Sequence, residues 1–182
     1  MNKVLAIAGI TLLTASYSYA VQDAVGAVDG SVKKIDAATK TIVVKTADGS
    51  ERTFHYAGDL AVHGGKDTAQ GSKDVLHGLK EGSVVAVHYS AVGGRDVAKE
   101  VDDIGVDGLK ITKGTVSKVD KAARTISVKT AEGTDETFHV TERAAKDTGK
   151  SVMNGVDRST KVTLYYTEEG GRKTAHFFKE AI

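Results

Sequence analysis

The fold is decided by the stretch Gly30–Tyr56, GSVKKIDAATKTIVVKTADGSERTFHY, which recurs 84 residues later as Gly114–Val140, GTVSKVDKAARTISVKTAEGTDETFHV. Fifteen of these 27 aligned positions are identical. A second match follows, in which Val87–Lys99 (VHYSAVGGRDVAK) aligns with Leu164–His176 (LYYTEEGGRKTAH). Self-similarity at a fixed period indicates a structural unit repeated along the chain. We therefore expect two tandem domains of the same fold.

Alternating apolar residues predict β-strands inside each repeat. In Thr41–Thr46, Ile42 and Val44 share one face of the strand, and the second copy keeps apolar residues at both positions. The second copy has Ser127 where the first has Val43. Because successive side chains of a strand point to opposite faces, Ile42 and Val44 are expected to face the core.

Two departures from simple alternation predict a bulge and a hairpin. The spacing from Val32 to Ile35 is three residues, which predicts a bulge or a sharp bend in the first strand. Asp48-Gly49 and its counterpart Glu132-Gly133 separate two alternating runs. Asp-Gly in this setting favours a type I′ hairpin turn, in which both central residues have positive φ.

The order of elements in each repeat predicts a small barrel. Three strands are followed by a weakly helical segment, Ser72–Leu79 in the first copy and Lys150–Val156 in the second, and then by two strands. This is the order of a five-stranded OB-type barrel. We therefore expect a mainly β protein of two tandem five-stranded OB-like barrels, each with a short helical segment between strands 3 and 4. The predicted boundaries are 30–104 and 114–182, with a linker at 105–113.

The first twenty residues have the pattern of a secretory signal peptide. Lys3 precedes an apolar run from Val4 to Leu13, and Ser18-Tyr19-Ala20 fits cleavage before Val21. An uncleaved membrane anchor is the alternative, but the run is shorter than the roughly 20 residues that span a bilayer. We expect a periplasmic or extracellular protein without membrane insertion after cleavage. The chain has no cysteine, so no disulfide stabilises it.

Charge and motif content exclude several classes of function. Removing residues 1–20 removes Lys3 from 25 basic side chains, which leaves 24 basic and 24 acidic side chains. A neutral chain lacks the basic surplus that nucleic acid binding requires, so nucleic acid is not expected as a partner. The catalytic patterns Gly-x-Ser-x-Gly and His-Glu-x-x-His are absent. The prediction is a non-catalytic protein without a cofactor.

The repeated motif also supports a family resemblance. The pattern G-x-V-x-x-[IV]-D-x-x-x-x-T-I-x-V-K-T, with G-G-R before the last strand, is present in both copies. It resembles a family of exported bacterial OB-like domains of unknown function, which is itself similar to the OB-fold proteins of the bacterial envelope. The resemblance implies an exported barrel that binds small or cationic ligands. It implies no role for any particular residue.

Three histidines of the first repeat, His63, His77 and His88, are absent from the second. Asp59, Asp67 and Asp74 are near them in sequence, and imidazole with carboxylate suits Zn²⁺, Ni²⁺ or Cu²⁺. The three histidines are therefore a candidate metal site, although structural zinc sites usually show closely spaced ligand pairs. The duplicated His55 and His139 are interpreted instead as residues of the solvent face of a strand.

Two pairs of adjacent aromatic residues, Tyr165-Tyr166 and Phe177-Phe178, are a candidate partner surface. One member of each pair should point outwards, because neighbouring strand residues face opposite ways. Packing of one barrel against the other is the alternative. The sequence thus favours an exported, non-catalytic binding or envelope-interaction module for an unknown protein, glycan or small ligand. The alternative is a periplasmic metal- or small-ligand-binding protein that uses the histidine-bearing loop of the first repeat.

Overall fold

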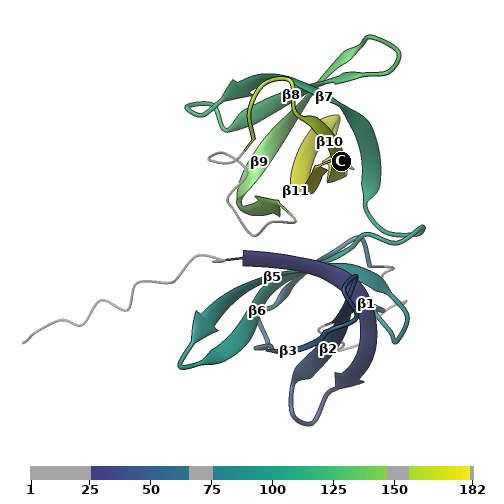
Figure 1. Ribbon diagram of the computed structural model, residues 1–182, viewed down its shortest axis with the longest axis vertical. Coiled ribbons are helices and arrows are strands. Elements are labelled where there is room, and N and C mark those ends of the chain that lie inside the picture. The colour runs from purple at the N-terminus through teal and green to yellow at the C-terminus, as the bar shows by residue number, and fades with distance from the viewer. Residues whose placement is uncertain (1–25, 66–75, 147–155, 181–182) are drawn as a thin grey trace, which may run out of the picture.

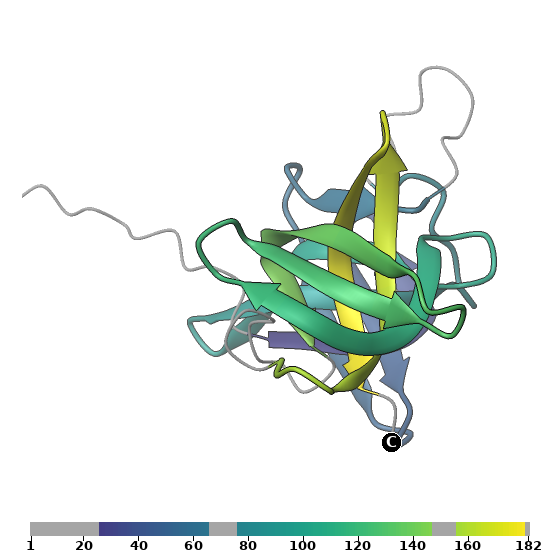
Figure 2. The same ribbon diagram turned by 90° about the horizontal axis from the view of Figure 1, so that it is seen from above.

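The computed structural model describes residues 26–65, 76–146 and 156–180, and these are almost entirely β-strand and turn. The first sheet contains β1 (Gly26–Asp36), β2 (Thr41–Thr46), β3 (Glu51–His55), β4 (Ala61–His63), β5 (Val84–Val92) and β6 (Arg95–Asp103). The second contains β7 (Lys110–Asp120), β8 (Thr125–Thr130), β9 (Asp135–Lys146), β10 (Lys161–Glu169) and β11 (Arg172–Glu180). Figure 1 shows the two units one above the other, and Figure 2 looks down onto the second unit.

The second unit confirms the predicted five-stranded barrel, whereas the first differs from it. Strands β7 to β11 form a closed barrel in the order β10-β11-β9-β8-β7. The first unit is a six-stranded sheet in the order β3-β2-β1-β5-β6-β4, with an additional pairing between β3 and β6. The prediction of two equivalent five-stranded barrels is therefore correct only in part.

The two units differ because a strand that continues in one is interrupted in the other. Strand β9 runs unbroken through Thr141–Ala144 and pairs in parallel with β11 on both sides of a register shift. At the corresponding place the first unit has Ala57–Leu60, whose Gly58 and Asp59 are poor strand formers. The chain turns there and resumes as the separate β4, which pairs in parallel with β6.

The predicted helical segments are not found in the described residues. Leu76–Leu79 forms a turn closed by a hydrogen bond from the Leu79 amide to the Leu76 carbonyl, 3.0 Å long. Both leucines are buried in the core of the first unit. The remainder of that segment, residues 72–75, and residues 150–155 of its counterpart lie outside the described residues, as do the predicted signal peptide and its cleavage site. No described helix is long and apolar enough to cross a membrane.

The local expectations for the strands are mostly confirmed. Ile42 and Val44 are fully buried, and the register of β1 on β2 shifts between Val32 and Lys34, as expected for a bulge. The predicted type I′ turn is wrong, because only Gly49 has a positive φ, at 84°, while Asp48 does not. The Asp48 carboxylate instead accepts a 3.1 Å hydrogen bond from the amide of Ser50 and so stabilises the turn.

The two units pack against each other through a small apolar cluster. Each unit has its own core, and a third cluster joins Ala27, Ala86 and Ile104 of the first unit to Phe177 of the second. An ion pair between Lys179 Nζ and Asp29 Oδ2, 2.6 Å apart, lies in the same interface. The second unit therefore covers part of the outer face of the first sheet, at β1 and β5.

Candidate metal centre between the two units

Two buried carboxylates lie on the face of β6 that packs against the second unit. Glu100 and Asp102 are 3% and 0% exposed, while Val101 between them belongs to the core of the first unit. Alternation along the strand thus points both carboxylates away from that core. Parallel pairing of β4 with β6 places His63 opposite Asp102.

The second unit contributes His176 from β11. Its Nδ1 lies 3.3 Å from Oε1 of Glu100, and its Nε2 lies 3.0 Å from the hydroxyl of Thr167. The ring centroids of His63 and His176 are 4.1 Å apart. Residues of β4, β6 and β11 therefore meet at one place between the two units.

These four residues have the spacing of a metal-binding site. Nδ1 of His63 is 3.0 Å from Oδ1 of Asp102 and 3.5 Å from Oε1 of Glu100. One ligand atom from each of His63, Glu100, Asp102 and His176 lies within 4.8 Å of the others. Ligands held about 2.0–2.1 Å from a tetrahedral ion are about 3.3 Å apart from one another. The distances from Oε1 of Glu100 to Nδ1 of His63 and of His176 are close to that value. Small movements of the four side chains would therefore suffice to surround an ion.

His88 contacts the same carboxylate but has no nitrogen available for a metal. Its Nε2 is 2.8 Å from Oδ2 of Asp102, and its Nδ1 is 2.7 Å from the carbonyl oxygen of Arg143. Both partners are acceptors, so both ring nitrogens donate and the imidazole is cationic. Burial alone would lower the pKa of His88, but the charge of Asp102 and the hydrogen bonds raise it. His88 therefore orients Asp102 from behind.

Together with the cationic His88, the protonated His63 balances the charges of Glu100 and Asp102 without a metal ion. Burial alone would lower the pKa of His63, but hydrogen bonds to Asp102 and Glu100 and their charges raise it to about 10. Burial likewise would raise the pKa of Glu100 and of Asp102, but the neighbouring histidines hold both below their usual range. A metal ion would displace the proton of His63, so its binding releases protons.

The structure brings together part of the histidine set that the sequence indicated. His63 belongs to the cluster, and His88 contacts Asp102. His77 is exposed on the turn after β4 and is not part of the cluster. Glu100, Asp102 and His176 were not expected as ligands. For the first two, the alternation Glu-Val-Asp is the pattern of a solvent-exposed strand face, so the sequence contains no signal that they are ligands. Asp67 and Asp74 lie outside the described residues.

The four aromatic residues proposed as a partner surface are largely buried. Phe178 and Tyr166 belong to the core of the second barrel, whereas Phe177 lies in the cluster between the units, with Tyr165 packed against it. Phe177 and Phe178 are both 0% exposed. Phe177 and Tyr165 therefore lie where the two units pack together, which was the alternative to a partner surface.

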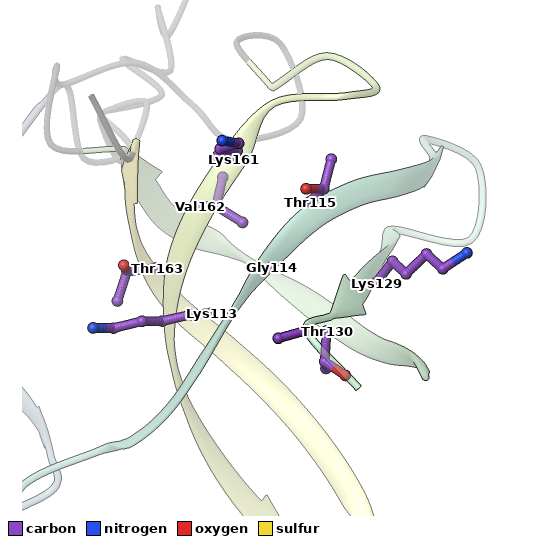
Figure 3. Close-up of a pocket in the computed structure, with 9 residues that line it drawn as sticks. Lys113, Gly114, Thr115, Lys129, Thr130, Lys161, Val162 and Thr163 are labelled. Carbon is purple, nitrogen blue, oxygen red and sulfur yellow. The ribbon is translucent and has the colours of Figure 1, made fainter. Parts of the chain in front are cut away.

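A separate hollow of about 330 Å³ lies beside Gly114 in the second barrel. Lys113, Lys129 and Lys161 line it, but Figure 3 shows the side chains of Lys113 and Lys129 extending in opposite directions. No charged groups converge there. The cluster between the two units is therefore the stronger candidate site.

Comparison with known proteins gives a weak structural similarity. No protein-family model matches the chain, and no curated protein sequence matches it. Among solved structures, the crystal structure of Ag(I)CusF is similar at 17% sequence identity, with a TM-score of 0.32. The match covers 42% of this chain and 93% of that one. At this TM-score the likeness carries no argument about function.

Proposed function

We propose that this protein binds one divalent transition-metal ion between its two units, through His63, Glu100, Asp102 and His176. The observation that carries this function is the convergence of four ligand atoms within 4.8 Å of one another, from strands of both units. Three of the four residues are buried, and the half-buried His63 is the member through which an ion can enter. The role is binding, not catalysis.

The donor set favours Zn²⁺, Ni²⁺ or Cu²⁺. Two imidazoles and two carboxylates suit borderline divalent ions, whereas Cu⁺ and Ag⁺ prefer thiolate or thioether sulfur. The chain has no cysteine and only two methionines, and neither methionine is among the cluster residues. Zn²⁺ fits best, because it readily takes four ligands in a tetrahedral arrangement.

Residues behind the ligands support this function. His88 donates to the far oxygen of Asp102, and Thr167 lies within hydrogen-bond distance of the far nitrogen of His176. Such outer contacts fix the orientation of metal ligands and the tautomer of a ligating histidine. Two of the four ligands are thus held in place by a neighbouring polar group.

The setting that we propose is outside the cytoplasm, with each repeat an OB-like binding unit. The charged, apolar and small-residue regions of residues 1–20 support export. Expression of the whole sequence in a bacterium, followed by intact-mass measurement of the periplasmic fraction, should give a chain that begins at Val21. A chain that keeps Met1 and stays in the cytoplasm would exclude export.

Calorimetric titration of the metal-free protein with Zn²⁺, Ni²⁺ and Cu²⁺ tests the metal site. We expect one ion per chain and a loss of affinity of at least tenfold in both His63→Ala and His176→Ala. The matched controls are His55→Ala and His139→Ala, which remove strand histidines outside the cluster. An affinity that falls equally in the controls, or no binding of any of the three ions, would overturn the function.

A further inference from the structure

A cleft of about 430 Å³ lies beside the candidate metal centre. Alternation along β11 puts Arg172, Thr174 and His176 on one face of the strand, and all three line the cleft. Thr167 and Glu169 of β10 line it too, paired across the strands with Thr174 and Arg172. The cleft therefore runs along the hairpin, from His176 at the metal centre to Arg172 beside the turn.

Two polar groups of the cleft have no partner among the described residues. The hydroxyl oxygen of Thr141 is buried without a hydrogen bond, which is costly inside a protein. Arg172 is exposed and forms no ion pair with any residue that the structure describes. A hydroxyl and a guanidinium are both donors, so their natural ligand is an oxygen anion, and a guanidinium binds carboxylate with two parallel hydrogen bonds.

The cleft is also the open side of the metal centre. His63 and His176 line it, whereas Glu100 and Asp102 lie behind them and are not among its lining residues. Arg172 is the positively charged residue among those that line the cleft, apart from the histidines of the metal centre. Glu169 is paired with Arg172 across the hairpin, and its negative charge repels a doubly charged phosphate more strongly than a singly charged carboxylate.

We infer that the cleft binds a small dicarboxylic acid, with one carboxylate as a fifth ligand of the metal ion and the other at Arg172. The Cα atoms of His176 and Arg172 are separated by four strand residues, or about 13 Å. Both residues line the same cleft, and an Arg172 side chain extended along it toward the metal would leave a gap that a short dicarboxylate spans. This ligand site presupposes the proposed metal centre. Two linked contacts bind more tightly than either alone, because the second is intramolecular.

Visible absorption of the Co²⁺-loaded protein tests this site, because the Co²⁺ spectrum reports a change in its ligands. We expect glutarate to change the spectrum at a concentration at least tenfold lower than acetate does. Arg172→Gln should remove that advantage. Arg95→Gln changes the arginine of the matching Gly-Gly-Arg hairpin in the first unit and should leave the advantage intact.

The outcomes separate this inference from the metal site itself. A Co²⁺ spectrum that neither acid changes, or that both acids change at equal concentration, would overturn the dicarboxylate site while the metal centre stands. An advantage of glutarate that survives Arg172→Gln would overturn the role of Arg172. Failure of Co²⁺ to bind at all would overturn this inference, whereas the titration with Zn²⁺, Ni²⁺ and Cu²⁺ decides the metal centre independently.

Discussion

His63 and His176 stack with their ring centroids 4.1 Å apart and their planes tilted by 38°, although one belongs to the first unit and the other to the second. Glu100 lies within 3.5 Å of an Nδ1 atom of each ring. The candidate site is therefore complete only when the two units pack in this arrangement. Because a ligand stabilises the state that binds it, metal binding should stabilise the packing of the units.

The side chain that fills the interface is Phe177, which is fully buried between the two units. We expect Phe177→Ala to lower the free energy of unfolding by about 3–5 kcal/mol, as for other buried aromatic residues. It should also weaken metal binding, because it loosens the contact that aligns the ligands. Phe178→Ala, in the barrel core, is the control of similar size. Unchanged metal affinity in Phe177→Ala would show that the site does not depend on this packing.

Asp102 should be the most costly carboxylate to remove. It is 0% exposed and contacts both His63 and His88. We expect Asp102→Asn to destabilise the metal-free protein by about 3–5 kcal/mol, because the cationic His88 is left buried without its counter-charge. Urea unfolding measures this loss. Glu51→Gln, which breaks the exposed pair with Lys33, should cost about 0–1 kcal/mol, and equal losses would contradict the buried network.

The raised pKa of His63 gives the metal-free protein a defined pH dependence. Folding raises this pKa from 6.5 to about 10, so the folded state favours the protonated form. The stabilisation is complete below about pH 6.5 and is lost as the pH rises through about 10. Urea unfolding between these limits should show the loss in the wild-type protein and a flatter profile in His63→Gln. Parallel profiles for the two proteins would contradict it.

An ion pair in each unit occupies equivalent positions with its charges reversed. Arg52 and Asp96 are joined at 2.5 Å in the first unit, and Lys173 and Glu136 at 2.8 Å in the second. In the repeat alignment Arg52 matches Glu136, and Asp96 matches Lys173. Each cation also lies over a tyrosine ring, Arg52 at 4.4 Å from the ring centroid of Tyr89 and Lys173 at 5.5 Å from that of Tyr166.

The reversed pair allows a charge exchange in the first unit. Arg52→Glu alone should destabilise the protein, because it places two carboxylates side by side. Adding Asp96→Lys should restore most of the loss, since the second unit already uses that arrangement. We expect a coupling energy of about 0.5–3 kcal/mol from the double-mutant cycle, measured by urea unfolding. A coupling near zero would show that the pair contributes nothing to stability.

The sequence correctly predicted the features that local patterns determine, namely which strand face is buried and where a strand bulges. Alternation identified the buried face of β2, Ile42 and Val44, and the three-residue spacing after Val32 identified the bulge. Such patterns record which side chains face a core. The separate strand β4 was not predicted. It arises because the chain turns at Gly58-Asp59, whereas the corresponding strand of the second unit, β9, continues without a break. The three-residue spacing of Leu76 and Leu79 is typical of a helix, but the two leucines belong to a turn and pack into the core of the first unit.

The candidate site could be predicted only in part because packing between the units creates it. Glu100 and Asp102 alternate with a core valine and therefore have the pattern of a solvent-exposed face. Only the second unit covers that face, and sequence periodicity does not indicate which outer face is covered. His176 aligns with Lys99 when the two similar stretches are compared, so their comparison gave no signal for it. His63 was identified by its nearness to aspartates in sequence, but its ligand partners come from other strands.

The most direct measurement is a crystal structure of the protein grown with Zn²⁺, with anomalous differences recorded at the zinc absorption edge. We expect one strong peak between the two units, about 2.0–2.2 Å from a ligand atom of each of His63, Glu100, Asp102 and His176. A map with zinc only at histidines outside the cluster, such as His55, His77 or His139, and none at this cluster, would contradict the metal centre.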